Sequence, residues 1–201
     1  YGVVQPDEGR MYWNGHEVRV SNPAQARSMG IGMVFQHFSL FETLTVAENI
    51  ALSLPPFEAQ DRRRLDERIR EVSERYGMAL DPRRYVSTLS VGERQRVEIV
   101  RCLIQESTLL ILDEPTSALG VAQTSMVLKF INKVRQKGLA VILITHNVRH
   151  AYAVGDRFTV LNRGATLGTH NHNEISIDEL QNLMAGGKEL QDFDGQLLGA
   201  V

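Results

Sequence analysis

The sequence has little of several features that define whole classes of protein. Cys102 is its only cysteine, which excludes an internal disulfide and a cysteine-based metal cage and is typical of a reducing compartment. No apolar run approaches the ~20 residues of a membrane-spanning helix. A formal net charge of −2 offers no bulk attraction for nucleic acid or anionic lipid. What remains is an ordinary globular composition, 43% hydrophobic over 201 residues, with enough chain to bury a core.

The most informative stretch is an apolar run that ends in two acids, Leu109-Leu110-Ile111-Leu112-Asp113-Glu114-Pro115. Four consecutive apolar residues predict a strand buried on both faces. In an open α/β sheet, ligands bind at the carboxyl ends of the strands. Asp113 and Glu114 are therefore placed to hold a divalent cation and activate a water. Alone, the pattern fits a strand with a solvated acidic exit equally well.

A second stretch predicts a capped helix that runs to Gln105. Ser90 and Glu93 stand at the spacing of a capping box, and apolar residues follow at helical spacing. A well-capped amphipathic helix explains this pattern fully. The functional alternative is that Gly92 lets backbone approach a phosphate at a helix N-terminus, where N–H groups are unpaired and the partial charge is positive.

The rest of the chain alternates predicted strands and helices. Asn14-Gly15 is the favoured pair for a hairpin turn, and Thr45 and Ser176 each begin a capping box. The charge run Arg62-Arg63-Arg64 is followed by acids, so we interpret it as a solvated helix face rather than a nucleic-acid patch. The remaining expected elements are a hairpin over 10–20, a helix starting at Pro23, a strand over 30–35 leading to Gln36, a helix over 61–76, a helix over 121–137 closed by Gly138, a strand over 140–145 leading to His146, a short helix to Val154, a hairpin over 157–169, a helix from Ser176 to Met184, and a tail or linker over 186–201.

Taken together, these segments resemble the ATP-binding cassette (ABC) ATPases, the nucleotide-driven motors of membrane transporters. The similarity extends from about Pro6 to Gly168. It rests on five motifs in the family's order: Gln36 as the Q-loop glutamine, Leu89-Ser90-Val91-Gly92-Glu93 as the signature motif, Leu109 to Pro115 as Walker B, Ser117-Ala118-Leu119-Gly120 as the D-loop, and His146 as the switch histidine.

The resemblance implies an α/β fold: a P-loop NTPase of the ABC type, truncated at its N-terminus. A RecA-like core would carry an antiparallel β subdomain and a helical signature subdomain. The expected domains are a remnant of the nucleotide-binding β subdomain over 1–40, the helical subdomain over 41–105, the core over 106–170, and a C-terminal helix and tail over 171–201.

The resemblance also implies ATP and Mg²⁺ as cofactors and a role for each motif. Asp113 and Gln36 would hold Mg²⁺, Asp113 through water. Glu114 would be the general base for the attacking water, and His146 would contact the γ-phosphate. Residues Ser90, Val91, Gly92 and Glu93 would close over ATP held by a second cassette, paired head to tail.

At two positions the sequence departs from the family's usual pattern. The signature glutamine is replaced by Glu93, and the usual D-loop acid by Gly120. An acid near a γ-phosphate is unfavourable unless its capping bonds hold it away. With Val91, both are similar to the simple-sugar and nucleoside importer branch. The resemblance thus implies a transport ATPase on the cytoplasmic face of the cell membrane. Its partners would be integral-membrane permease subunits, contacted at Phe38 and Phe41, a second cassette and, indirectly, a periplasmic or lipoprotein solute-binding protein, with no nucleic acid.

The larger departure is that no Gly-x-x-x-x-Gly-Lys-Ser/Thr occurs in the sequence. Because the chain starts at Tyr1 and its first residues resemble the segment after the P-loop helix, we expect this loop upstream. The chain alone is then expected to be nearly inactive and only marginally stable. Two alternatives stay open: a soluble cassette ATPase acting on nucleic acid or ribosomes, and a non-hydrolytic regulatory cassette.

Overall fold

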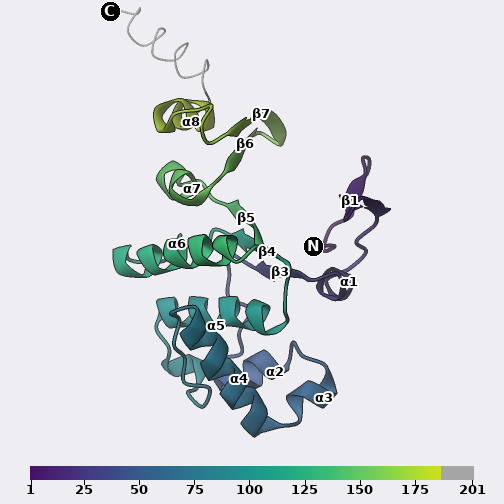
Figure 1. Ribbon diagram of the computed structural model, residues 1–201, viewed down its shortest axis with the longest axis vertical. Helices are drawn as coiled ribbons and strands as arrows, with labels where there is room; N and C mark the ends of the chain where they lie inside the picture. The colour runs from purple at the N-terminus through teal and green to yellow at the C-terminus, as the bar shows by residue number, and fades with distance from the viewer. Residues whose placement is uncertain (187–201) are drawn as a thin grey trace, which may run out of the picture. The chain divides into compact units, whose positions relative to one another are not determined.

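The computed structural model describes residues 1–186, and the chain divides into two compact units, one over 1–144 and one that begins at Thr145. Figure 1 traces the order of the elements. The predicted tail, apart from Gly186, lies outside the described residues.

The first unit is organised around a three-stranded parallel sheet in the order β3-β4-β5. The strands are β3 (Ile31–Val34), β4 (Leu109–Asp113) and β5 (Ala140–Ile144). The register pairs Val34 with Leu112 and Asp113 with Ile144. Because all three strands run the same way, their carboxyl ends lie at one edge of the sheet.

One face of this sheet is buried and the other is only partly covered. On β4, Leu110 and Leu112 are fully buried, whereas Leu109 and Ile111 on the other face are only partly buried. On β5, Ile142 and Ile144 are 48% and 46% exposed. The prediction that β4 is buried on both faces is therefore wrong. Near β3, helix α1 and Tyr1 pack against this second face of the sheet. Near β5, the same face is exposed.

The N-terminal part of the first unit is a hairpin followed by a short helix. β1 (Met11–Trp13) pairs antiparallel with β2 (His16–Val18). Asn14 and Gly15 both have positive φ, 51° and 80°, as a type I′ turn requires. Helix α1 (Pro23–Ser28) begins with the predicted proline and is capped by the side chain of Asn22. These predictions are confirmed.

Four helices, α2 to α5, form one group in the first unit, low in the view of Figure 1. Capping boxes at Thr45 and Ser90 start α2 and α5 as predicted. A short helix that the sequence did not lead us to expect, α3, precedes α4. The bounds are α2 (Val46–Ala51), α3 (Pro56–Ala59), α4 (Arg62–Arg75), the 3-10 turn η1 (Val86–Thr88) and α5 (Val91–Ile104).

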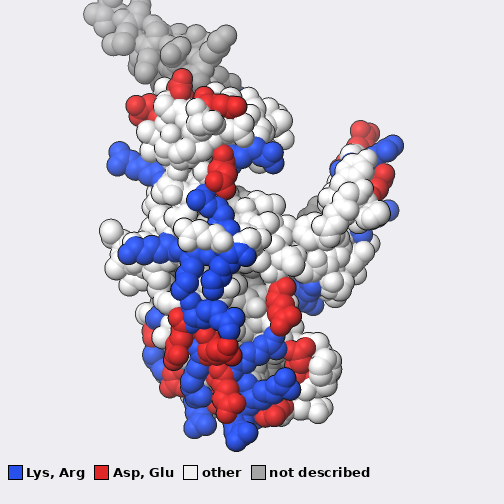
Figure 2. All heavy atoms as spheres, in the orientation of Figure 1, with Lys and Arg blue, Asp and Glu red and all other residues white. Residues whose placement is uncertain are grey.

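The surface of this helical group carries both signs of charge, interleaved, as Figure 2 shows. Arg62 lies 3.8 Å from Glu48, and Arg63 lies 3.8 Å from Glu67. Only one apolar stripe of α4 is buried, through Leu65 and Ile69. The arginine run thus belongs to a solvated helix face with acids beside it.

Helix α6 (Val121–Gln136) completes the first unit and contacts β5. Phe130, Ile131 and Val134 bury its inner face. The positive φ of Gly138, 84°, lets the chain turn from the helix end into β5.

The second unit is a small helix–hairpin–helix assembly. Its elements are α7 (Val148–Val154), β6 (Arg157–Asn162), β7 (Ala165–Asn171) and α8 (Ile177–Met184). Phe158 packs in its core with Ile175 and Leu180, and Tyr152 stacks on Phe158 with ring centroids 5.6 Å apart. Within residues 1–186, no helix combines the length and apolar character needed to cross a bilayer.

Candidate nucleotide and magnesium site

Asp113 is the last residue of β4 and Glu114 is the first residue beyond it. The acids therefore stand at the carboxyl edge of the parallel sheet, as the sequence predicts. Both side chains are neither fully buried nor fully exposed. A carboxylate in this position can contact both the protein and a bound solute.

The backbone of Glu114 has an unusual conformation. Its φ is +47°, in the left-handed region that few non-glycine residues adopt, although the residue before a proline is normally extended. The Glu114 N–H donates to the Ile144 carbonyl at 2.9 Å, and its own carbonyl accepts from the Ser117 hydroxyl at 3.0 Å. Bonds on both sides thus hold this strained residue, which is typical of functional sites.

Gln36 follows the neighbouring strand by two residues and is exposed. Because β3 and β4 are adjacent and parallel, Asp113 at the end of β4 and Gln36 just beyond β3 lie at the same edge of the sheet. His146 follows β5 by two residues in the chain but belongs to the second unit, where it is exposed. Its contact with the γ-phosphate stays a prediction.

The donor chemistry at this edge fits magnesium. Asp113 offers carboxylate oxygens and Gln36 an amide oxygen, which are the hard ligands that Mg²⁺ prefers alongside water. No cluster of three or more His, Cys, Asp or Glu side chains placed to hold a metal occurs within residues 1–186. When Mg²⁺ binds together with nucleotide phosphates, it usually takes only one or two ligands from the protein, so a site with two ligand side chains is sufficient.

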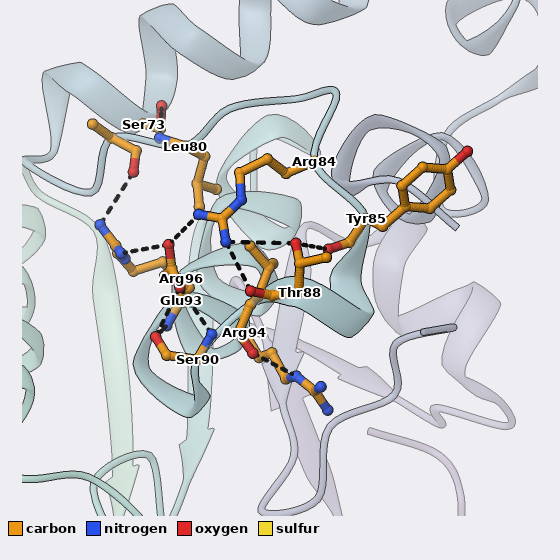
Figure 3. Close-up of polar contacts among 11 residues, drawn as sticks. Ser73, Leu80, Arg84, Tyr85, Thr88, Ser90, Glu93, Arg94 and Arg96 are labelled. Atoms are coloured by element: carbon orange, nitrogen blue, oxygen red, sulfur yellow. Dashed lines mark hydrogen bonds and ion pairs between the residues drawn. The ribbon is translucent and has the colours of Figure 1, made fainter. Parts of the chain in front are cut away.

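The signature motif begins α5, and Figure 3 shows its polar contacts. The Glu93 carboxylate accepts from the Ser90 N–H at 2.8 Å and the Ser90 hydroxyl at 2.9 Å. Arg84 donates to the other carboxylate oxygen at 2.6 Å and also to the Thr88 carbonyl at 2.8 Å. The Ser90 backbone hydrogen bond is the main reason that the pKa of Glu93 is lowered, with help from Arg84. The acid that replaces the signature glutamine is thus held in a cap and paired with a cation.

Gly92 has a packing reason to be glycine. A Cβ at this position would lie 2.7 Å from Cγ of Gln123 in α6, closer than real Cβ contacts allow. The phosphate-approach interpretation of Gly92 stays a prediction, because the atom that limits its size here is a side chain. Gly120 is the N-cap of α6 and gives that helix no side-chain capping bond.

Several polar residues of this region were missed by the sequence analysis: Arg84, Arg94, Glu98, Arg101 and Gln123. Glu98 is 1% exposed although charged, and its neighbours in the chain, Val97 and Ile99, are fully buried. A carboxylate between apolar residues of a buried helix was the one available signal, because buried charges are normally paired.

Comparison with known proteins decides the family. The family model described as ABC transporter matches residues 1–117, more than half of the chain. The chain belongs to the ABC transporter family. Among solved structures, the ADP conformation of the ATP-binding cassette MJ1267 superposes on this ABC chain with a TM-score of 0.77 at 20% identity, covering 96% of this chain and 80% of that one. The expected α/β cassette fold is therefore confirmed.

Two curated relatives of this ABC chain are import ATP-binding proteins. The nucleoside import ATP-binding protein NupA of Lactococcus lactis is 36% identical over 187 residues, which are 92% of this chain and 37% of that protein. The ribose import ATP-binding protein RbsA 1 of Rubrobacter xylanophilus is 36% identical over 194 residues, 96% and 39% respectively. The chain thus spans less than two-fifths of the length of the curated relatives it matches.

Proposed function

We propose that this chain forms part of an ATP-binding and ATP-hydrolysing subunit of an ABC importer that powers uptake of a simple sugar or a nucleoside. The observation that carries the proposal is the Asp113–Glu114 pair at the carboxyl edge of the sheet, with Glu114 held in a left-handed conformation. The names of the import relatives support the class of solute.

In the proposed site, Asp113 and Gln36 hold the metal, Asp113 through a water. When bound, Mg²⁺ neutralises charge on the phosphates and orients them. Glu114 accepts a proton from the attacking water or polarises it, and loss of such a base typically lowers the rate by ~10²–10⁴-fold. His146 contacts the γ-phosphate and orients the same water. These groups act mainly by position and electrostatics, because the transition state carries dispersed negative charge.

The N-terminus of α5 closes over the nucleotide that a second cassette holds. Ser90, Val91 and Gly92 present backbone N–H groups and the positive end of the helix to the triphosphate of a second cassette. The capping bonds of Glu93 and its ion pair with Arg84 support this role, because they offset the repulsion between an acid and a phosphate. A dimeric ABC cassette structure, MJ0796 with ADP and Pi, is similar to this chain at a TM-score of 0.65 and 25% identity.

We place the protein on the cytoplasmic face of the cell membrane, bound to permease subunits, with a periplasmic or lipoprotein solute-binding protein as indirect partner. A groove of about 850 Å³ along α2 and α4 supports a permease contact, and Leu52 in its lining is 63% exposed. Phe41, 60% exposed, lies on the segment that leads into α2. Phe38 is less exposed and remains the weaker candidate.

The test uses the full-length polypeptide assembled with its permease in vesicles. Glu114→Gln should abolish most ATP turnover while nucleotide binding survives, and Glu67→Gln, which removes an exposed α4 carboxylate, should change neither. Unabated turnover in Glu114→Gln would contradict the proposed function. Co-purification with RNA rather than with a membrane subunit would favour the soluble cassette alternative.

One observation favours a second candidate, a non-hydrolytic cassette that regulates a partner: the given sequence contains no glycine-rich loop ending in Lys-Ser/Thr. A cassette of this kind would close over a nucleotide without cleaving it. It would show Glu114-independent nucleotide binding and no turnover in the assembled transporter.

A further inference from the structure

The segment 39–42, which follows Gln36, is fixed to one face of the signature helix. Arg94, Glu98 and Arg101 of α5 are spaced i, i+4 and i+7, so they lie on the same side of the helix. All three contact this segment. The arrangement links the sequence that carries Gln36 to the helix that Ser90 begins.

Glu98 is the centre of the link. One carboxylate oxygen accepts from the Ser39 N–H at 2.7 Å and lies 3.2 Å from the Ser39 hydroxyl. The other oxygen pairs with Arg101. Glu98 is 1% exposed, and a buried carboxylate is retained only when its partners satisfy it.

Arg101 closes the arrangement from its other side. Its guanidinium donates to the Ser39 hydroxyl at 2.8 Å and to the Ser39 carbonyl at 3.3 Å. Ser39 therefore makes hydrogen bonds to Glu98 and Arg101 through its N–H, its hydroxyl and its carbonyl. Four hydrogen bonds, made through three different groups of Ser39, fix the position of this residue.

A second contact on the same face reaches the signature motif directly. Arg94 pairs with Glu42 and donates through Nε to the Leu89 carbonyl at 3.2 Å. The backbone adds the Ser87 N–H donating to the Glu42 carbonyl at 3.1 Å. Segment 39–42 is thus tied both to the body of α5 and to the residues that lead into it.

We propose that Glu98 is a positioning residue, which fixes the segment following Gln36 to the signature helix so that Gln36 and Ser90 keep one relative position. The roles of those two residues rest on the proposed function. Gln36 serves the metal of one nucleotide and Ser90 the phosphates of the other. Because Gln36 and Ser90 are rigidly linked, a displacement of Gln36 at one nucleotide also displaces Ser90 at the other.

The first measurement is hydrogen exchange of the 201-residue chain in Glu98→Gln. Ser39 and Arg101 use different carboxylate oxygens of Glu98, and a glutamine places an NH2 group, which cannot accept, where one of them stood. Because the charge that holds Arg101 is also lost, the Ser39 amide should exchange roughly tenfold faster or more. The matched control is Glu67→Gln, whose carboxylate is exposed in a surface pair with Arg63. Ser39→Ala, which removes only the hydroxyl, should give a smaller increase in the same segment and guards against failure of Glu98→Gln to fold.

A purely structural role predicts a different pattern. It would raise exchange in the core of α5 and at Ser39 in parallel, and it would expose the thiol of Cys102, which is 3% accessible. Positioning predicts selective loss of protection over 39–42 with the Cys102 thiol still unreactive. Unchanged exchange at Ser39, or a uniform rise across the first unit, would overturn the proposal.

The second measurement uses the assembled full-length transporter. Glu98→Gln should lower kcat for ATP by at least tenfold with KM nearly unchanged, because binding groups remain while their alignment is lost. A wild-type kcat despite faster Ser39 exchange would also overturn the proposal. Failure of the proposed function would be distinguishable, because Glu114→Gln would then leave turnover intact, or the unaltered transporter would show none, whatever the exchange result.

Discussion

Arg84 and Glu93 form a 2.6 Å ion pair at the start of the signature helix, and Figure 3 shows Glu93 held by Ser90 at the same time. The pair explains how an acid occupies the position of a neutral glutamine. One carboxylate oxygen of Glu93 accepts the capping bonds of Ser90, and the other pairs with the Arg84 guanidinium. The replacement therefore need not repel an incoming phosphate.

The capping boxes predict how stability depends on pH. In the boxes begun by Thr45, Ser90 and Ser176, backbone hydrogen bonds lower the pKa of Glu48, Glu93 and Glu179 below the ordinary 4.5. A carboxyl whose pKa is depressed on folding stabilises the native state fully above 4.5. That contribution is lost as the pH falls from 4.5 through the folded-state pKa.

Denaturant titrations between pH 3 and pH 7 measure this effect. The free energy of unfolding should fall below about pH 4.5. Glu93→Gln should flatten that fall, because a neutral side chain cannot titrate, whereas Glu67→Gln should leave it unchanged. Ser90→Ala should cost about 1 kcal/mol at pH 7 through the lost cap. An equally steep fall in Glu93→Gln would show that its cap does not contribute.

The close approach of Gln123 to Gly92 predicts that Gly92→Ala destabilises the protein when Gln123 is present and stabilises it when Gln123 is replaced by alanine. Gly92→Ala places a methyl 2.7 Å from Cγ of Gln123, and overpacking of this kind costs ~1–3 kcal/mol. When Gln123→Ala is made first, the methyl has room and alanine's higher helix propensity should stabilise the protein by up to ~1 kcal/mol. Chemical denaturation of the two single variants and the double variant measures the cycle. Additive effects would mean that the contact does not limit residue 92.

Local sequence signals predicted most element boundaries, because caps and turns act within a few residues. Asn14-Gly15 and the capping box at Ser90 fixed element ends that the structure reproduces. The failures have a common cause: they depend on which distant elements are packed together. The half-open face of β5 follows from the placement of α1 near β3, which no local pattern encodes.

In the candidate site, too, local features could be predicted from the sequence and features that depend on distant residues could not. Asp113 and Glu114 could be predicted, because an apolar strand followed by two acids has a distinct chemistry. The left-handed backbone of Glu114 could not, because proline after it predicts extended backbone. Glu98 was missed, because Ser39, which satisfies its carboxylate, stands 59 residues earlier and only the fold brings the two together.

The strain at Glu114 predicts that two substitutions which both remove its carboxylate differ in stability. Its φ of +47° costs an ordinary side chain ~1–2 kcal/mol, whereas asparagine tolerates this region better. Glu114→Asn should therefore be more stable than Glu114→Gln by roughly 0.5–1 kcal/mol, although both remove the carboxylate. Thermal or urea unfolding of the two variants gives the comparison. Equal stabilities would indicate that the surrounding bonds to Ile144 and Ser117 absorb the strain.

The activity of the 201-residue chain on its own is the last prediction. Its sequence has Asp113, Glu114 and Gln36 but no glycine-rich loop with the Lys-Ser/Thr that cradles phosphates. Without that cradle the nucleotide is not held against the base, so the general-base contribution has nothing to act on. Phosphate release by the purified chain with ATP and Mg²⁺ should match that of Glu114→Gln. Turnover above that variant would mean that the edge of this sheet binds and aligns ATP without a P-loop.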